Sequence, residues 1–139
     1  GKALLIRRGS EPLLGQWSIP GGTLELGETL LEGVARQMLE ETAVTVRVLD
    51  LIEVFERISP YSTPEVRDAA QRPQFHFVIV DYLCEKVSGE AKAGGDATDV
   101  AFASEDDLPH YQLTDAATRV LRSAFAMERA RRKIVGSEI

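Results

Sequence analysis

The chain of 139 residues has the length of one domain, and its 44% hydrophobic and 27% charged residues are typical of a globular protein. Its net charge is −6, from 16 Lys and Arg against 22 Asp and Glu, which argues against a broad nucleic-acid-binding surface. The one cysteine, Cys84, excludes a disulfide within the chain. No long apolar run predicts a membrane span and no signal peptide opens the chain, so we expect a cytoplasmic location.

The first predicted element is a strand over residues 3–8, which are apolar and β-favouring. The chain opens directly on this strand, which leaves open that a short lead-in strand precedes residue 1. Turn-forming residues follow and end in a Pro-Gly-Gly run before residue 23. Residues 29–32, with the sequence TLLE, match a capping box and predict that a helix begins at Thr29.

The predicted helix has an apolar face on one side and carboxylates on the other. Gly33 lies inside it and should weaken it slightly. Glu40 and Glu41 should project away from the apolar face. Five residues recur at helical spacing and form the expected buried face: Leu31, Val34, Ala35, Met38 and Thr42.

The middle of the chain predicts mainly strands. Residues 44–58 are rich in β-branched side chains and predict one or two strands, and residues 59–74 are polar and predict a long loop. Residues 75–84 predict the strongest strand, which should be central because both of its faces are mainly apolar. A turn over residues 88–95 and a short strand over residues 100–102 should follow.

The last predicted element is a helix capped by Thr114. No internal repeat or second domain is evident, so residues 1–139 should form a single mixed α/β (α+β) domain. The expected buried face of this last helix consists of Ala117, Val120, Leu121, Ala124 and Phe125.

The candidate chemistry lies between residues 22 and 44. Arg36 and Glu40 are four residues apart, as are Gln37 and Glu41, so each pair shares a side of the predicted helix. Glu28, just before the cap, can fold towards the same region. Adjacent carboxylates repel unless a cation neutralises them, and Mg²⁺ or Mn²⁺ prefers such oxygen ligands. For Glu40 and Glu41 alone, a solvated acidic helix face is the competing interpretation.

The spacing of these residues resembles the Nudix box. The resemblance implies a Nudix-type α/β/α sandwich with a mixed central sheet and the box helix on one face. It also implies hydrolysis, dependent on Mg²⁺ or Mn²⁺, of a diphosphate bond in a nucleoside diphosphate linked to another moiety. The matching residues are Gly22, Glu28, Arg36, Met38, Glu40, Glu41 and Val44, preceded by Trp17, Pro20 and Gly21.

By the same resemblance, Glu40 and Glu41 are the implied metal ligands, helped by the Gly21 carbonyl. Glu28 and Arg36 are implied to act as supporting residues in the catalytic site. A further carboxylate should come from a later loop. Asp99 is the first expectation because it directly precedes the short strand, and Asp96 is the second; for both, a turn-forming aspartate is the alternative. Arg7 or Arg8 could hold a terminal phosphate or be an exposed strand charge.

Two positions depart from the box, which has Glu where Gln37 stands and Gly where Ala43 stands. Ala43 matters little if its backbone does not need a positive φ. Gln37 should be a weakened metal ligand, because a neutral amide binds cations less strongly and cannot take a proton. In the competing account, Glu32 or a carboxylate of residues 96–99 has replaced it. The loss also leaves open a nucleotide-binding module with weak or no catalysis, or a scaffold.

The substrate markers point in two directions. Pro60 resembles the marker of ADP-ribose pyrophosphatases and Tyr61 that of dinucleoside-polyphosphate hydrolases, and the whole chain favours an ADP-ribose-like substrate. Tyr61 or Phe55 could stack on a base, although we expect packing instead. The expected partner is a small-molecule nucleotide, with no nucleic acid and no membrane, and a homodimer is left open.

Overall fold

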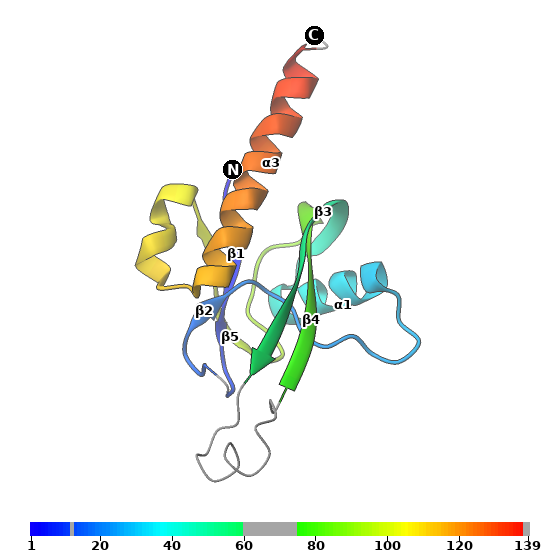
Figure 1. Cartoon of the computed structure of the whole chain (residues 1–139), viewed down its shortest axis with the longest axis vertical. Coiled ribbons are helices and arrows are strands. Elements are labelled where there is room, and N and C mark those ends of the chain that lie inside the picture. The colour runs from blue at the N-terminus through cyan, green and yellow to red at the C-terminus, as the bar shows by residue number, and fades with distance from the viewer. Residues whose placement is uncertain (12, 60–74, 138–139) are drawn as a thin grey trace.

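The computed structural model describes residues 1–11, 13–59 and 75–137 (Figure 1). The predicted first strand, box helix and last helix are confirmed, whereas the short 3₁₀ helix η1 was not foreseen. The elements are β1 (Ala3–Arg8), β2 (Trp17–Ser18), α1 (Leu30–Thr42), β3 (Thr45–Ser59), β4 (Phe75–Ser88), β5 (Ala97–Ala103), η1 (Glu105–Tyr111) and α3 (Asp115–Ser137).

The described strands form two sheets. β1 lies between β2 and β5 and pairs antiparallel with both, and β3 pairs antiparallel with β4. The single mixed sheet implied by the resemblance is therefore corrected, for the described residues, to two antiparallel sheets. β3 and β4 are consecutive strands with no described helix between them, and a parallel pair needs a long crossover.

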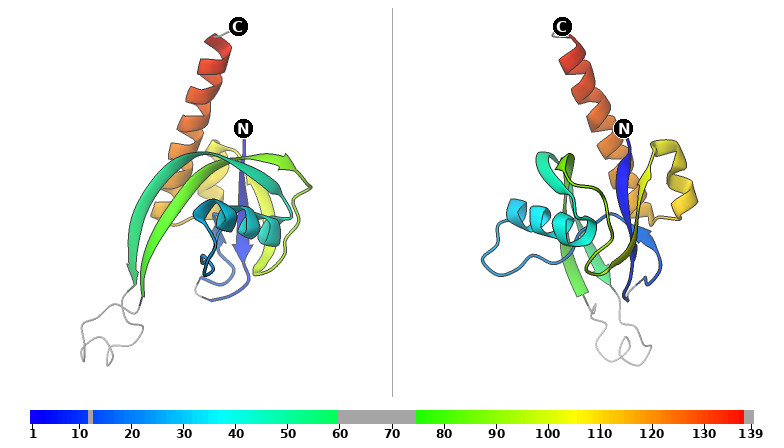
Figure 2. Two further views of the ribbon diagram at one scale, coloured as in Figure 1. Left: turned by 90° about the vertical axis from the view of Figure 1, so that its right-hand side faces the viewer. Right: turned by 180° about the vertical axis from the view of Figure 1, so that it is seen from behind.

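The layers nevertheless form the expected α/β/α arrangement. The β3–β4 hairpin lies between α1 and α3 in Figure 1 and in the rear view of Figure 2, and both helices contact β3. Figure 2 also shows the hairpin as a long curved ribbon. The mixed α+β class is thus confirmed.

The prediction that residues 75–84 form a central strand is wrong for the described part of the chain. β4 pairs there with β3 alone. Phe77 and Val78, on neighbouring positions and so on opposite faces of β4, are 40% and 65% exposed. Apolar residues on both faces of β4 therefore do not mean that the strand is buried between two others; Figure 2 shows β3 and β4 together as one arched ribbon.

The main core lies between β1, β5, η1 and α3. Trp17 packs edge-on against Tyr111, with ring centroids 5.3 Å apart. Thr114 Oγ1 accepts a hydrogen bond from the Ala117 N–H at 3.2 Å and caps α3, as predicted. Among the helices of residues 1–11, 13–59 and 75–137, none is long and apolar enough to cross a membrane. The buried core residues are Leu5, Ala103, Leu108, Leu121 and Phe125.

Candidate active site

The site is built on α1, and the start of this helix follows from local sequence. The Thr29 side chain accepts a hydrogen bond from the Glu32 N–H at 3.1 Å, and the Glu32 carboxylate accepts one from the Thr29 N–H at 3.3 Å. The predicted capping box is therefore confirmed. Because the cap engages the Glu32 carboxylate, this residue is a poor substitute for the acidic side chain that Gln37 lacks.

The buried side of α1 differs from the predicted face. Thr42 is buried as predicted, but Leu31 is 53% exposed, and Gly33 and Glu41, which the pattern placed elsewhere, are buried. A Cβ on Gly33 would lie 2.8 Å from Leu24 Cδ1 and 3.1 Å from Glu28 Oε1. The absence of a side chain at Gly33 thus lets the preceding loop lie directly on the helix, a role that the sequence pattern did not reveal.

Arg36 fastens that loop to α1. Its Nε and Nη2 donate to the two Glu28 carboxylate oxygens at 2.6 and 3.0 Å. Its Nη1 donates to Glu40 Oε2 at 3.1 Å, and its Nη2 also donates to the Thr23 carbonyl at 3.1 Å. The hydrogen bond from Arg36 lowers the pKa of Glu28, with further help from the Glu25 N–H. Two of the three carboxylates of the predicted cluster, Glu28 and Glu40, are therefore held by one guanidinium.

Glu41 lies in a different environment, which corrects the expectation that it projects away from the packed side. Only 9% of the residue is exposed, and burial raises the pKa of its carboxyl to about 7. A hydrogen bond from the Gly21 backbone opposes this shift, the negative charge of Asp96 adds to it, and the positive charge of Arg8 opposes it. The hydrogen bond from Gly21 and the charge of Arg8 thus do not fully offset the cost of burying the ionised Glu41 carboxylate.

The C-terminal end of α1 explains how Asp96 reaches this region. The Lys92 and Gly94 N–H groups donate to the carbonyls of Thr42 and Glu41 at 2.9 and 3.1 Å. A Cβ on Gly94 would lie 2.6 Å from the Glu40 carbonyl oxygen, so only glycine permits this approach. The Gly-Gly pair directly before Asp96 was the sequence signal for this contact.

The two candidate aspartates therefore lie in different environments. Asp96 interacts electrostatically with Glu41. Asp99 lies in β5 opposite Arg7, and its Oδ1 accepts a hydrogen bond from the Val100 N–H at 2.8 Å. Of the two, the second choice, Asp96, is the one whose negative charge acts on Glu41. The adjacent arginines also differ, because Arg7 Nε donates to the Gly15 carbonyl at 3.0 Å while Arg8 acts on Glu41.

The two departures from the box are structurally informative. Ala43 has φ 60° and ψ 17°, the left-handed conformation that glycine adopts without strain. This backbone position does need a positive φ, so the replacement of the box glycine by Ala43 is not a minor departure. Gln37 Nε2 donates a hydrogen bond to the Thr23 carbonyl at 3.0 Å, which a carboxylate at this position could not do.

The site fits a hydrated divalent cation better than a closed metal cage. Within residues 1–11, 13–59 and 75–137, no three His, Cys, Asp or Glu side chains converge on one metal position. Mg²⁺ typically binds one or two carboxylates, keeps several waters and takes the remaining oxygens from substrate phosphates. Glu41, with Asp96 near it, supplies that kind of donor set.

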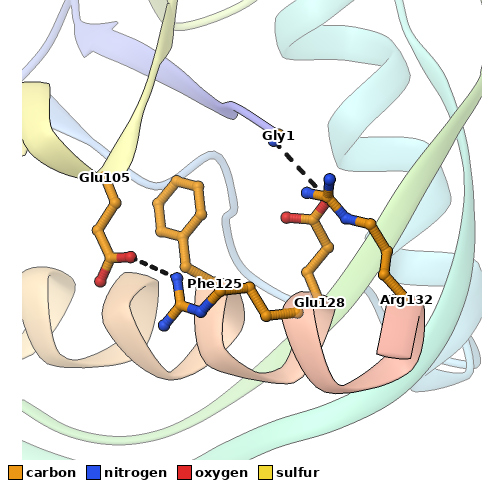
Figure 3. A pocket seen from close by; sticks show the side chains of 6 residues that line it. Gly1, Glu105, Phe125, Glu128 and Arg132 are labelled. Carbon is orange, nitrogen blue, oxygen red and sulfur yellow. Dashed lines mark hydrogen bonds and ion pairs between the residues drawn. The ribbon is translucent and has the colours of Figure 1, made fainter. Parts of the chain in front are cut away.

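A cavity of about 580 Å³ lies elsewhere, between η1 and α3 (Figure 3). Glu105 at its edge pairs with Arg129 at 2.6 Å and with Arg122 at 3.6 Å. These ion pairs join η1 to α3, and none of the α1 carboxylates lines the cavity.

The predicted substrate markers Pro60 and Tyr61 lie outside the described residues. Phe55 packs under Arg119, with 5.1 Å from the guanidinium carbon to the ring centroid.

Comparisons with known proteins agree with this architecture. A family profile described as the NUDIX domain matches residues 1–124. An ADP-ribose pyrophosphatase of Methanocaldococcus jannaschii is 37% identical over 108 residues, which are 78% of this chain and 57% of that relative. The nucleoside triphosphatase NudI of Escherichia coli K12 is 26% identical over 113 residues, 78% of this chain and 75% of NudI. The crystal structure of a MutT NUDIX hydrolase from Burkholderia pseudomallei is 30% identical, with a TM-score of 0.70 and 88% of each chain covered.

The α/β/α domain, with its acidic helix α1, has the fold of a NUDIX hydrolase, as the likeness to the B. pseudomallei structure shows. With its domain profile matched over most of its length, this chain belongs to the NUDIX family. The chain spans 57% of the length of the M. jannaschii relative.

Proposed function

We propose that the chain is a metal-dependent hydrolase that cuts a diphosphate bond in a nucleoside diphosphate linked to another moiety, with an ADP-ribose-like substrate favoured. The observation that carries the proposal is the buried Glu41 carboxylate, whose pKa is raised to about 7 with Asp96 near it. A divalent cation would supply the missing positive charge. The 37% identical relative, described as an ADP-ribose pyrophosphatase, supports the substrate class.

Bound Mg²⁺ or Mn²⁺ would neutralise the diphosphate oxygens and activate a water. Glu41 would hold the cation, assisted by Asp96 and by Glu40. The Gly21 N–H orients the Glu41 carboxylate. Arg8, whose charge acts on Glu41, would face a substrate phosphate.

The supporting residues act on the geometry of this site. Arg36 holds Glu28 with two hydrogen bonds and orients Glu40 with a third, so the loop and the helix carboxylates keep a set spacing. Asp99 and the Gly21 carbonyl remain further proposed ligands, whereas the ligand role first expected for the Gln37 side chain is tested against a positioning role below. The variants Asp96→Asn and Asp99→Asn show which aspartate is a metal ligand. Only the loss of a ligand should raise the metal concentration needed for half-maximal activity.

A nucleotide-binding module without catalysis is the second candidate, because Gln37 leaves the site one carboxylate short of the box. The decisive experiment incubates the chain with ADP-ribose, nucleotide sugars, dinucleoside polyphosphates and nucleoside triphosphates, each with chelator, Mg²⁺ or Mn²⁺. Cleavage that requires the cation supports the hydrolase. Binding without cleavage would select the module, and cleavage undiminished in chelator would overturn the metal mechanism.

A further inference from the structure

We propose that Gln37 is a positioning residue whose side-chain amide clamps the glycine turn at residues 21–23 onto α1 without needing a metal ion. The starting observation is the 3.0 Å hydrogen bond from Gln37 Nε2 to the Thr23 carbonyl. A carbonyl oxygen only accepts hydrogen bonds, so the side-chain atom that faces it must be a donor. An amide meets this need, and an ionised carboxylate does not.

The turn is shaped around this amide. A Cβ on Gly22 would lie 3.0 Å from Gln37 Nε2 and 3.4 Å from its Cδ, so the backbone passes directly over the side chain. Arg36 Nη2 donates to the same Thr23 carbonyl at 3.1 Å. Two neighbouring side chains of α1 thus converge on one backbone oxygen and hold the turn.

The clamp acts on the site through Gly21. The Gly21 backbone hydrogen-bonds the Glu41 carboxylate, and Gly21 lies two residues before the carbonyl that Gln37 holds. A displaced turn would therefore misplace a donor to Glu41. The catalytic consequence rests on the proposed hydrolase function, whereas the clamp itself is a property of the metal-free chain.

Two substitutions distinguish a clamp from a weakened metal ligand. Gln37→Met keeps the length but removes the donor without adding charge. Gln37→Glu removes the donor and places a negative charge opposite a carbonyl oxygen and close to Glu41. Gln112→Glu is the matched control, because it makes the same charge change at an exposed glutamine after η1.

The first measurement is hydrogen exchange of residues 19–28 in the metal-free proteins, followed by mass spectrometry together with the melting temperature. We expect exchange about 2- to 10-fold faster in Gln37→Met and Gln37→Glu than in the wild type and Gln112→Glu, as for one lost hydrogen bond. Added Mg²⁺ or Mn²⁺ should restore slow exchange in Gln37→Glu but not in Gln37→Met. Wild-type exchange in both metal-free variants would overturn the clamp.

The second measurement is a metal titration of hydrolysis on whichever substrate the panel identifies. A clamp predicts that Gln37→Met lowers kcat at saturating metal and leaves the metal concentration for half-maximal activity unchanged. If that concentration rises and kcat recovers at saturation, Gln37 is a ligand and the proposal fails. Absence of hydrolysis in the wild type would reject the proposed function alone, because the exchange result does not depend on catalysis.

Discussion

The two sides of the molecule are held together by different forces. On the α1 side, the loop is fastened to the helix by charged and polar groups: Arg36 with Glu28, and Gln37 with Thr23. On the α3 side, the core around Leu5 is apolar and buried, and the ion pairs of Glu105 with Arg122 and Arg129 lie outside it. Apolar packing is insensitive to pH and cations, whereas contacts of carboxylates depend on both. Substitutions on the α3 side should therefore change stability, and those on the α1 side should change activity and metal response.

The largest effect is expected on the α3 side. Phe125→Ala removes a ring that is 7% exposed and should lower the free energy of unfolding by about 3–5 kcal/mol. The folded fraction should keep its kcat, because no atom of the site is touched. Urea unfolding and activity per folded molecule test this together. A loss of kcat in the folded fraction would contradict the division between the two sides.

Glu41→Gln is the strongest test of the α1 side. We expect kcat/KM to fall by about 10²- to 10³-fold, the scale seen when one group that stabilises transition-state charge is removed. The metal-free protein should still fold, because Gln is nearly isosteric with Glu and removes a buried negative charge that the site does not neutralise. Wild-type turnover by this variant would reject the assignment of Glu41.

The pH dependence of stability follows from the same residue. The pKa of Glu41 is about 7 in the folded chain against 4.5 for an unperturbed carboxyl. Between these values the folded state keeps a proton that the unfolded state releases. The resulting stability is fully present below about pH 4.5 and is lost as the pH rises through 7. Melting temperatures of metal-free protein should show this decline, and Glu41→Gln should flatten it; an equal decline in both proteins would assign it to other groups.

Two bidentate arginine pairs provide an internal comparison. Arg36 binds Glu28 beside the proposed metal site, and Arg119 binds the two carboxylate oxygens of Glu53 between α3 and β3. Lysine cannot reproduce the two parallel hydrogen bonds of a guanidinium. Arg36→Lys should reduce activity or metal affinity by about 10- to 100-fold, the usual effect of losing a group that orients a ligand. Arg119→Lys should leave both unchanged, and equal losses in the two variants would refute a special role for Arg36.

The smallest effect concerns Ala43. Its φ of 60° is strained for alanine and not for glycine. Ala43→Gly should raise the free energy of unfolding by about 0.5–1 kcal/mol, since the relief of strain is partly offset by the greater backbone entropy of unfolded glycine. Urea denaturation measures this gain. A loss of stability would mean that the left-handed conformation is not retained in solution.

Features determined by neighbouring residues were predictable from the sequence. The capping box at Thr29, the Thr114 cap and the pairing of Arg36 with Glu40 join residues three or four positions apart. Such contacts form as soon as the helix does, so pattern and spacing suffice to find them. The family and its layered fold followed from the same local motif and its order among the strands.

Only the tertiary structure decided the relations between distant segments. It buried Glu41, brought the charge of Asp96 near enough to raise the pKa of that carboxyl, and made Ala43 a strained left-handed residue. Asp96 reaches this region because residues 92–94 hydrogen-bond the end of α1, about 50 positions earlier in the chain. The approach of Gly94 to the Glu40 carbonyl fixes that contact. Periodicity along one segment carries no information about which backbone will pack against its end, because that choice is made by long-range packing.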